Sequence, residues 1–463
     1  MNSPQRAPRA VSPVTHVTQK VLAKAVQSAQ NRVLSSPLDS SLAIHYRITG
    51  GTPLHGTVAI SGSKNAALPL LAGSLICKGK TVFTNVPRLR DTETFLAILD
   101  FLGANTSIDG TTVTINTDTV TNRPIPHELV SKLRGSIVLL GPLLARFGEV
   151  QMAYPGGCVL GKRPVAAHIE AFKAMGIEDF STDTQLHLKG TLKPSDVVLS
   201  EFSVTATENI LLASSLLVGK TRIELAAAEP HVQDVCRFLI ERGISIEGVG
   251  SHSLLIHGQK TLLPAKEHRV ISDYLEAGAF LIAGIVTRGK VTVEQSDPRH
   301  LTSFIGALRR AGACVSIDQA TGDITADGTT SKLLATRIQT NIFPGFPTDL
   351  QAPFGVLLTQ AEGVSRIFEV LFEGRMAYLY ELEKMGAKVE ILNSHQALII
   401  GPTPLQGKQV ASNDIRAGVG MVIAGLCSEG ETVVTDVQYI ERGYDRLEEK
   451  LKRLGAKISR VEH

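Results

Sequence analysis

The chain has 463 residues, a formal net charge of +3, 43% hydrophobic residues, 20% charged residues and no tryptophan. This length exceeds one ordinary hydrophobic core, so two domains are the first expectation. The composition excludes a disordered chain, and no apolar run approaches the roughly 18 residues of a membrane span. Basic residues are spread along the chain, so we expect neither a nucleic-acid nor a membrane partner.

The first segment, residues 1–43, differs in composition from the rest. It is rich in Ser, Pro, Gln and basic residues, and Asp39 is its only acidic residue. An acid-poor basic leader is typical of an organelle presequence, whereas a disordered terminal tail is the simpler interpretation. Both interpretations place this segment outside the folded domains.

From residue 44 onward, one sequence motif recurs six times. It consists of the end of an amphipathic helix, a glycine and a short strand in which apolar and polar residues alternate. LAILDFLGANTSI and RLEEKLKRLGAKI are examples. Each glycine suits the left-handed conformation that ends a helix. The spacing of about 70 residues is too long for a solenoid repeat and predicts βαβαββ-sized units, three in each of two domains. The six glycines are Gly103, Gly176, Gly243, Gly312, Gly386 and Gly455.

Each unit opens with an apolar phrase after a small polar start, such as SKNAALPLLAG or DIRAGVGMVIAG. Helices that are apolar on nearly all sides are typical of segments packed inside a domain. Only their first turns are then free to face a cleft, and helix N-termini attract phosphates and carboxylates. Lys64, Arg134, Asp349 and Arg416 lie at or beside such starts, so we expect an anion-binding cleft between the domains.

The turn YPGGCVLGKRP, residues 154–164, places Cys158 beside Lys162 and Arg163. Neighbouring cations stabilise a thiolate, so this cysteine is predicted to be reactive. The other four cysteines are expected to pack in apolar surroundings. The five cysteines form no CxxC pair and no cluster with histidine, which argues against disulfides and zinc and favours a reducing compartment.

Several phrases together resemble the bacterial UDP-N-acetylglucosamine enolpyruvyl (1-carboxyvinyl) transferases. They include GSKNAALPLLA, PGGCVLGKRPV, FPTDLQAPF and ERGYDRLEEKLKRLGA, and the resemblance runs from about residue 44 to the C-terminus. It implies a two-domain inside-out α/β barrel with three repeats per domain, a double hinge and a cleft between the domains. The expected domains are residues 44–63 plus 272–463, and residues 64–271 with the Cys158 loop.

The resemblance also implies the reaction. The enolpyruvyl group of phosphoenolpyruvate is transferred to the 3-hydroxyl of UDP-N-acetylglucosamine by addition and elimination, with release of phosphate. This is the first committed step of peptidoglycan synthesis in the cytoplasm. The acceptor hydroxyl must lose a proton, while C3 of the enol gains one and later returns it. No metal, nicotinamide or flavin is implied, and the oligomeric state is left open.

By the same resemblance, Cys158 lies on a loop that closes over the cleft and handles the proton at C3. It would be alkylated by an epoxide analogue of phosphoenolpyruvate such as fosfomycin. Asp349 is the expected base, and Lys64 is the third catalytic residue. The expected substrate-binding residues are Arg163, Arg416 and Arg442 for phosphoenolpyruvate, Asn65 and Arg134 in the same cleft, and His168, Ser203, Val204 and Thr205 for the nucleotide. Asp414 and Glu208 are expected to orient the cations.

One position departs from the family pattern. After GKRP the family continues Val-Asp-Leu-His, but this chain reads VAAH, with Ala166 in place of an aspartate that helps to read uracil. An alternative is therefore a paralogue that transfers enolpyruvate to another nucleotide, such as UMP. The shikimate-pathway transferase lacks the PGGC phrase. A non-catalytic relative is disfavoured because Lys64, Cys158 and Asp349 are present together.

Overall fold

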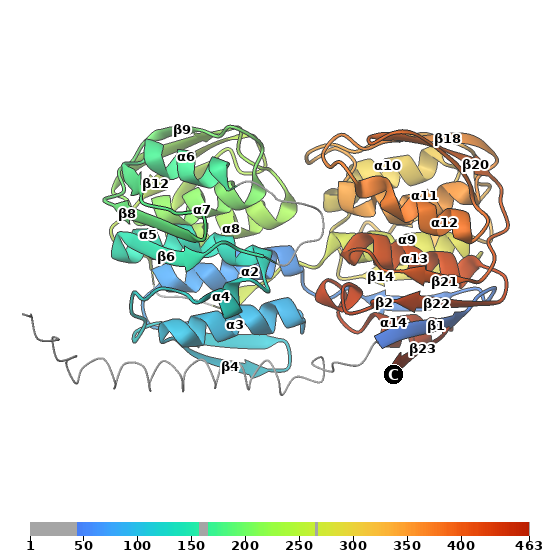
Figure 1. Cartoon of the computed structure of the whole chain (residues 1–463), viewed down its shortest axis with the longest axis horizontal. Coiled ribbons are helices and arrows are strands. Elements are labelled where there is room, and N and C mark those ends of the chain that lie inside the picture. Colours follow the sequence, from blue (N-terminus) through green and yellow to red (C-terminus); the bar gives the residue numbers. More distant parts are fainter. Residues whose placement is uncertain (1–43, 157–164, 264–266, 463) are drawn as a thin grey trace, which may run out of the picture.

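The computed structural model describes residues 44–156, 165–263 and 267–462. The expectations for residues 1–43, Cys158 and Arg163 therefore lie outside the described residues. The described chain forms two α/β halves that lie next to each other (Figure 1). Within these ranges, no helix combines the length and apolar character that crossing a membrane requires. Within the same ranges, no group of three or more His, Cys, Asp or Glu side chains could hold a metal ion.

Six small sheets in the described residues share one pairing pattern. In five of them, a parallel strand pair is followed by two antiparallel pairs, as in the order β9-β10-β12-β11. The sixth sheet, β6-β8-β7, contains the antiparallel pairs, and an isolated parallel bridge between Ile125 and Met152 replaces the parallel pair. The predicted six-fold repeat of βαβαββ units is thus confirmed.

The strands of one half, in sheet order, are β13 (His268–Arg269), β3 (Lys80–Thr84), β5 (Thr112–Asn116) and β4 (Asn105–Asp109); β6 (Glu149–Ala153), β8 (Gln185–Gly190) and β7 (Ile177–Asp179); β9 (Asp196–Val198), β10 (Gly219–Glu224), β12 (Ser253–Gly258) and β11 (Ser245–Glu247). Those of the other half are β2 (His55–Ala59), β14 (Lys290–Glu294), β16 (Ile324–Asp327) and β15 (Cys314–Ile317); β17 (Arg337–Gln339), β18 (Gly363–Phe368), β20 (Gln396–Gly401) and β19 (Lys388–Asn393); β21 (Gln409–Ala411), β22 (Glu431–Thr435), β1 (Ile44–Thr49) and β23 (Lys457–Glu462).

The first long helix of each unit is buried inside its half, and the second lies nearer the surface. All residues of α9 and α11 are buried, which explains why these helices are apolar on every side. The inner helices are α2 (Lys64–Gly73), α5 (Leu140–Phe147), α7 (Val204–Ser214), α9 (Tyr274–Val286), α11 (Gln351–Thr359) and α13 (Ile415–Cys427). The second helices are α3 (Arg90–Leu102), α6 (Ala166–Ala174), α8 (Pro230–Ile240), α10 (Thr302–Arg310), α12 (Tyr378–Lys384) and α14 (Leu447–Arg453), and the short α4 (His127–Val130) precedes α5.

The six glycines of the repeat all adopt positive φ angles, between 78° and 101°. Each follows the end of a second helix and precedes a strand, as Gly103 does between α3 and β4. Residues with a Cβ atom are strained in this conformation, so glycine is the residue that suits it. The helix–glycine–strand phrase is therefore confirmed in every unit.

The buried side chains form two separate hydrophobic cores. One core is built from residues between 66 and 270, and the other combines residues 44–60 with residues 274–458. We propose that the domain boundaries lie at 63/64 and 271/272, and this separation supports that division. The packing of the cysteines is mixed: Cys77 and Cys236 are buried as expected, but Cys314 is exposed because it lies on the edge strand β15.

The chain crosses between the two cores twice, and the crossings are hydrogen-bonded to each other. The N–H of Ser63 donates to the carbonyl of Ile271 at 2.7 Å, and the N–H of Asp273 donates to the carbonyl of Ser61 at 2.8 Å. β2, before the first crossing, pairs with β14, which follows the second crossing, while β13 pairs with β3. The crossings therefore form a short two-stranded ribbon between the domains.

A charged cluster around the buried side chains of Asp234 and His268 fixes the second crossing. Asp234 of α8 accepts the N–H of Ile271 at 3.0 Å, and its other oxygen lies 2.8 Å from Arg237 Nη2 and 3.2 Å from His268 Nε2. His268 Nδ1 lies 2.7 Å from Glu241 Oε2. Burial alone would lower the pKa of His268, but the two carboxylates outweigh burial and raise this pKa.

Alanine substitution at two glycines of similar φ tests whether the repeat glycine Gly312 is also required by a close backbone approach. Gly312 has φ 78°, and a Cβ atom there would lie 1.9 Å from the carbonyl oxygen of Lys332. Gly79 has φ 75° and open space around the same position. We expect Gly79→Ala to lower the free energy of unfolding by about 1–2 kcal/mol and Gly312→Ala by at least about 3 kcal/mol, measured by urea unfolding. Equal losses would contradict the close approach at Gly312.

Candidate active site

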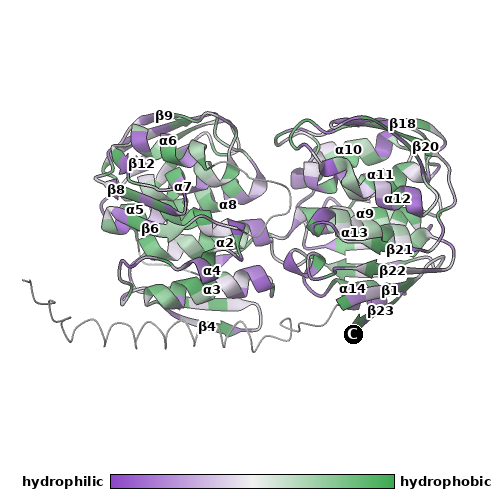
Figure 2. Ribbon diagram, in the orientation of Figure 1, coloured by the Kyte–Doolittle hydropathy of each residue, from purple (hydrophilic) through white to green (hydrophobic). Residues whose placement is uncertain are grey.

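The inner helices begin where the two domains face each other. Figure 2 shows hydrophilic segments on these facing sides, while the middle of each inner helix is hydrophobic. In one domain the starts are those of α2, α7 and the 3-10 helix η2 (Arg134–Leu139), which leads into α5. In the other they are those of α9, α13 and the 3-10 helix η4 (Thr348–Leu350), which leads into α11. Six helix starts with their N–H groups thus surround one interdomain region.

The buried carboxylate of Asp91 joins two predicted cations across the domain boundary. Lys64 Nζ lies 3.2 Å from Asp91 Oδ2, and Arg442 Nε from the other domain donates to Oδ1 at 2.9 Å. The side chains of Lys64, Arg442 and Asp91 are 12%, 18% and 5% exposed. Asp91 was not predicted from the sequence. It lies in the first turn of α3, which gave no sign that it would meet residue 442.

A second carboxylate, Asp349 in η4, lies between two arginines. Arg375 Nη1 donates to Oδ1 at 2.8 Å, and Arg416 Nε, from the first turn of α13, donates to Oδ2 at 3.1 Å. Both arginine side chains are less than a tenth exposed, whereas that of Asp349 is 23% exposed. Arg375 was also not singled out by the sequence, although the phrase FEGRMA contains it.

These contacts set the protonation state of Asp349. Burial alone would raise the pKa of its carboxyl, but Arg416 and Arg375 hold this pKa well below its usual range. Asp349 is therefore ionised and a weak proton acceptor while both arginines are in place. Asp414, predicted to orient a cation, accepts the N–H groups of Arg416 and Ala417 at 2.7 and 2.9 Å and so begins α13.

On the other domain, His168 of α6 meets the start of α7. Its Nε2 lies 2.9 Å from Thr205 Oγ1, and Ser203 accepts the N–H of Ala206 at 3.4 Å and so caps α7. Burial, and then the charge of Arg134, lower the pKa of His168 to about 4. The imidazole is thus neutral near pH 7 and acts as a hydrogen-bonding group.

The remaining predicted residues are found at or near the same helix starts. Asn65 is the second residue of α2 and Val204 the first of α7, and both are half-buried. Ala166 is exposed at the first position of α6.

The expectation for Glu208 is wrong. This carboxyl lies inside α7, and burial, followed by the charge of Glu229, raises its pKa well above the usual range. These surroundings favour the neutral carboxyl group, which cannot orient a cation by charge.

The family follows from comparison with known proteins. Residues 48–451 match the family described as EPSP synthase (3-phosphoshikimate 1-carboxyvinyltransferase). This match spans well over half of the chain, so the chain belongs to this family of enolpyruvyl (1-carboxyvinyl) transferases.

Within the family, the chain is 43% identical over 422 residues to a UDP-N-acetylglucosamine 1-carboxyvinyltransferase of Psychromonas ingrahamii, covering 90% of this chain and 99% of that protein. It is 42% identical over 418 residues to the protein of the same name from Shewanella amazonensis, covering 89% and 99%. The resemblance drawn from the sequence motifs is confirmed.

Solved structures agree on the fold. The enolpyruvyl transferase NikO from Streptomyces tendae matches with a TM-score of 0.81 at 24% identity, covering 91% of this chain and 100% of that one. An EPSP synthase from Acinetobacter baumannii matches with a TM-score of 0.70 at 20% identity, covering 90% and 100%. At these identities the likeness establishes the fold alone, and the predicted two-domain α/β architecture is confirmed.

The charge arrangement around Asp349 predicts a pH effect on stability. A carboxyl whose pKa is lowered by folding stabilises the protein above its unfolded pKa of about 3.9, and this contribution is lost as the pH falls through the folded pKa. Arg375→Gln raises the folded pKa of Asp349, so we expect a lower free energy of unfolding than wild type at pH 7. This difference narrows only as the pH falls through the folded pKa of the variant. Urea unfolding at pH 7 and at successively lower pH measures it.

The matched control is Arg366→Gln, which removes the same charge from the exposed face of β18. A loss of stability at pH 7 no larger in Arg375→Gln than in Arg366→Gln would contradict the stabilisation of the Asp349 carboxylate by Arg375.

Proposed function

We propose that this protein transfers the enolpyruvyl group of phosphoenolpyruvate to the 3-hydroxyl of UDP-N-acetylglucosamine and releases phosphate. The observation that carries the proposal is the 43% identity over 99% of a relative named for this transferase activity. The reaction would serve peptidoglycan synthesis in the cytoplasm. Lys64 and Arg416 lie in the first turns of α2 and α13, where anions bind, and Arg442 shares the carboxylate of Asp91 with Lys64. These placements give independent physical support.

Phosphoenolpyruvate is an anion with a phosphate and a carboxylate, and it requires several cations to leave water. Lys64 and Arg442 share Asp91, and Arg416 is held by Asp349. These carboxylates keep the cations desolvated and in position before the substrate arrives. The anionic groups of a bound substrate can therefore replace the carboxylates as hydrogen-bond acceptors for the same cations. Because these cations are already largely removed from water, substrate binding requires little further desolvation of them.

This exchange also gives Asp349 its role as the base. The acceptor hydroxyl must lose a proton as it attacks C2 of the enol, but Asp349 is a poor base while Arg375 and Arg416 bind it. When Arg416 turns to the phosphoenolpyruvate anion, the pKa of Asp349 rises and the carboxylate can accept that proton. Phosphoenolpyruvate thus activates the base as it binds.

Cys158 supplies the second proton transfer in this proposal. As the hydroxyl oxygen bonds to C2, the thiol protonates C3 to a methyl group. A proton then leaves C3, the C2–O bond to phosphate breaks and the enol double bond reforms. Arg163, two residues after Gly161, adds a cation for the phosphate. Both residues lie outside the described residues, and their roles rest on the motif.

The nucleotide half of the acceptor is assigned to His168, Ser203, Val204 and Thr205. A neutral imidazole hydrogen-bonded to Thr205 and a capped start of α7 suit a polar, uncharged ligand edge next to a diphosphate. Ala166 offers no polar side chain for the uracil ring. The alternative acceptor, UMP, gains no support from the relatives, which are named for the UDP-sugar.

The acceptor is tested by phosphate release from phosphoenolpyruvate, with UDP-N-acetylglucosamine, UMP and shikimate 3-phosphate offered separately. We expect turnover with the UDP-sugar alone, because the relatives share that name over nearly their whole length. Turnover with UMP and none with the UDP-sugar would show that the proposed acceptor is wrong. The proposal that the protein transfers the enolpyruvyl group of phosphoenolpyruvate would still hold.

Asp349→Asn tests the base. It keeps the shape of the side chain and removes its basicity, so we expect kcat to fall by about 10²–10⁴-fold with the fold unchanged by circular dichroism. The control, Asp196→Asn, changes a mostly exposed carboxylate of β9 and should leave kcat unchanged. Near-normal activity in Asp349→Asn would rule out this residue as the base.

Cys158→Ser tests the reactive cysteine. We expect an epoxide analogue of phosphoenolpyruvate to add one covalent label to wild type, detected by mass spectrometry, and none to Cys158→Ser. Cys314→Ser is the matched control, because Cys314 is an exposed thiol remote from the motif. A label on Cys314 in place of Cys158 would contradict the assignment.

A further inference from the structure

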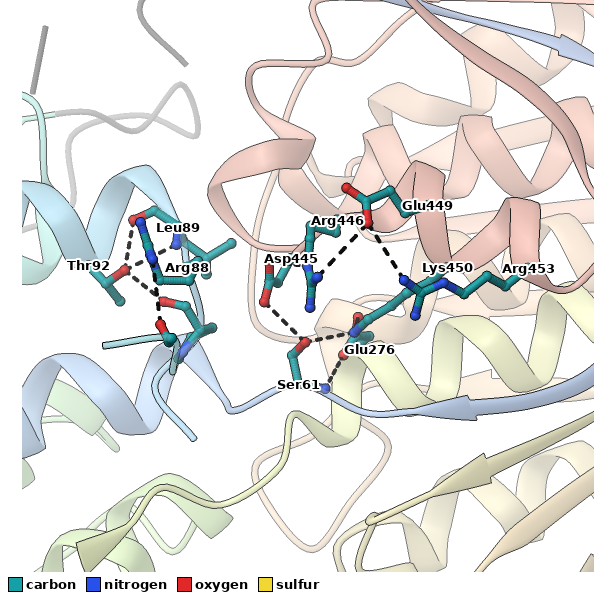
Figure 3. A network of polar contacts seen from close by, with 12 residues as sticks. Ser61, Arg88, Leu89, Thr92, Glu276, Asp445, Arg446, Glu449, Lys450 and Arg453 are labelled. Atoms are coloured by element: carbon teal, nitrogen blue, oxygen red, sulfur yellow. Dashed lines mark hydrogen bonds and ion pairs between the residues drawn. The ribbon is translucent and has the colours of Figure 1, made fainter. Parts of the chain in front are cut away.

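A cavity of about 230 Å³ lies at the first crossing between the domains, outside the group of helix starts. Its wall combines β2 and the crossing (residues 57–62), a loop of the other domain (residues 85–87), and the segment from Asp445 to Arg453 that contains α14. Figure 3 shows the polar side chains of this region gathered around Ser61. The cavity is thus lined by both domains and by the crossing itself.

Lys450 supplies a buried cation to the cavity wall. Its ammonium lies 2.6 Å from Glu276 Oε1 and 2.7 Å from Ser61 Oγ, and the side chain is 9% exposed. An ammonium group has three donors, and these contacts use two of them. One donor remains for a ligand in the cavity.

Asp445 supplies a buried acceptor that lacks a donor. The residue is 4% exposed, and its Oδ2 accepts the hydroxyl of Ser61 at 3.3 Å. Its Oδ1 is buried without a hydrogen-bond partner among the described residues, and the Nε atom of Arg446 lies 3.6 Å away, too far for a hydrogen bond. Buried carboxylate oxygens are normally paired, so this atom indicates a missing donor.

Two arginines at the cavity are held only loosely. Arg446 Nη1 and Arg453 Nη2 each lie 3.9 Å from the same oxygen of Glu449. All three side chains are at least half exposed, at 57%, 73% and 50%. Such long, exposed ion pairs contribute little to the stability of the fold. A phosphate can form shorter, bidentate contacts with both guanidinium groups.

We propose that this cavity binds a small phosphorylated sugar or polyol. The phosphate lies between Arg446 and Arg453, and a hydroxyl group donates to Asp445 Oδ1. A simple anion does not satisfy the free carboxylate oxygen. An ammonium donor would be repelled by Arg446 and Lys450, so a neutral hydroxyl is the donor that fits. Val58, Ile60 and Pro87 supply apolar wall for the carbon skeleton.

Ligand binding in this cavity would influence the hinge. The hydroxyl of Ser61 accepts a hydrogen bond from the Lys450 ammonium and donates one to Asp445. The backbone N–H of Ser61 donates to Glu276 Oε2 at 2.8 Å, and its carbonyl accepts the N–H of Asp273 in the second crossing. A ligand that contacts both domains beside Ser61 favours the domain arrangement in which all its contacts form. The site therefore has the placement of a regulatory site, and its existence does not depend on the proposed reaction.

The test is calorimetric titration of the full-length protein with glucose 6-phosphate, glycerol 3-phosphate and inorganic phosphate. We expect at least one of the two organic phosphates to bind about tenfold more tightly than inorganic phosphate. Arg453→Gln should weaken that binding about tenfold, which corresponds to the loss of one charge-assisted contact. Asp445→Asn should reduce the preference over inorganic phosphate.

Two variants separate the cavity from other sites. Lys452→Gln removes a charge from the same helix, where Lys452 pairs with Glu448 outside the cavity, and should leave binding unchanged. Arg442→Gln reports binding at the helix starts. The proposal is overturned if neither organic phosphate binds at about 10 mM, if inorganic phosphate binds equally well, or if Arg442→Gln abolishes binding that Arg453→Gln leaves intact. Arg453 is mostly exposed, so its substitution leaves the fold available for measurement.

Discussion

Pairing of cations with carboxylates at the starts of buried helices is the interaction on which this structure depends. The inner helices are mainly apolar, so their first turns are the main places where the chain can offer charge to the interdomain region. Cations placed there are largely removed from water, and desolvated charges require partners. Asp91 and Asp349 provide them, and Asp91 does so across the domain boundary. Both sets of pairs fix the cations of the candidate site, and the Asp91–Arg442 pair also links the two domains.

The sequence predicted the features that depend on local physics. Six glycines at positive φ could be found because the left-handed helix end needs a residue without Cβ, and the inner helices because their apolar pattern has no polar face. Asp91 and Arg375 could not be found in this way. Their roles arise from contacts to residues 351 and 26 positions away, which only the folded chain brings together. The prediction for Glu208 was wrong for a related reason. Its carboxyl is buried inside α7, and the sequence does not show which polar side chains the folded chain buries.

The charge pairs also explain how one site can be both stable and reactive. A general base works best with a pKa near the operating pH, yet Asp349 in this structure is held far below it by two guanidinium groups. Stability favours that pairing, whereas proton transfer requires its release. In the proposed mechanism, an incoming anion that competes for Arg416 resolves the conflict, because it gives Arg416 another negative partner and leaves Asp349 with one arginine. Under that proposal, binding of one substrate would raise the basicity of Asp349 toward the other.

The hinge cavity extends the same reasoning to domain movement. Arg442, which crosses the boundary to Asp91, lies three residues before Asp445, which lines the cavity, and both precede α14. A shift of this short segment moves a cation of the site and the wall of the cavity together. Because Ser61 joins Lys450, Asp445 and the second crossing, such a shift also changes the contacts of the hinge. A ligand that holds Asp445 and one that holds Arg442 therefore act on the same short segment, and the two sites are coupled if the two ligands favour different positions of it.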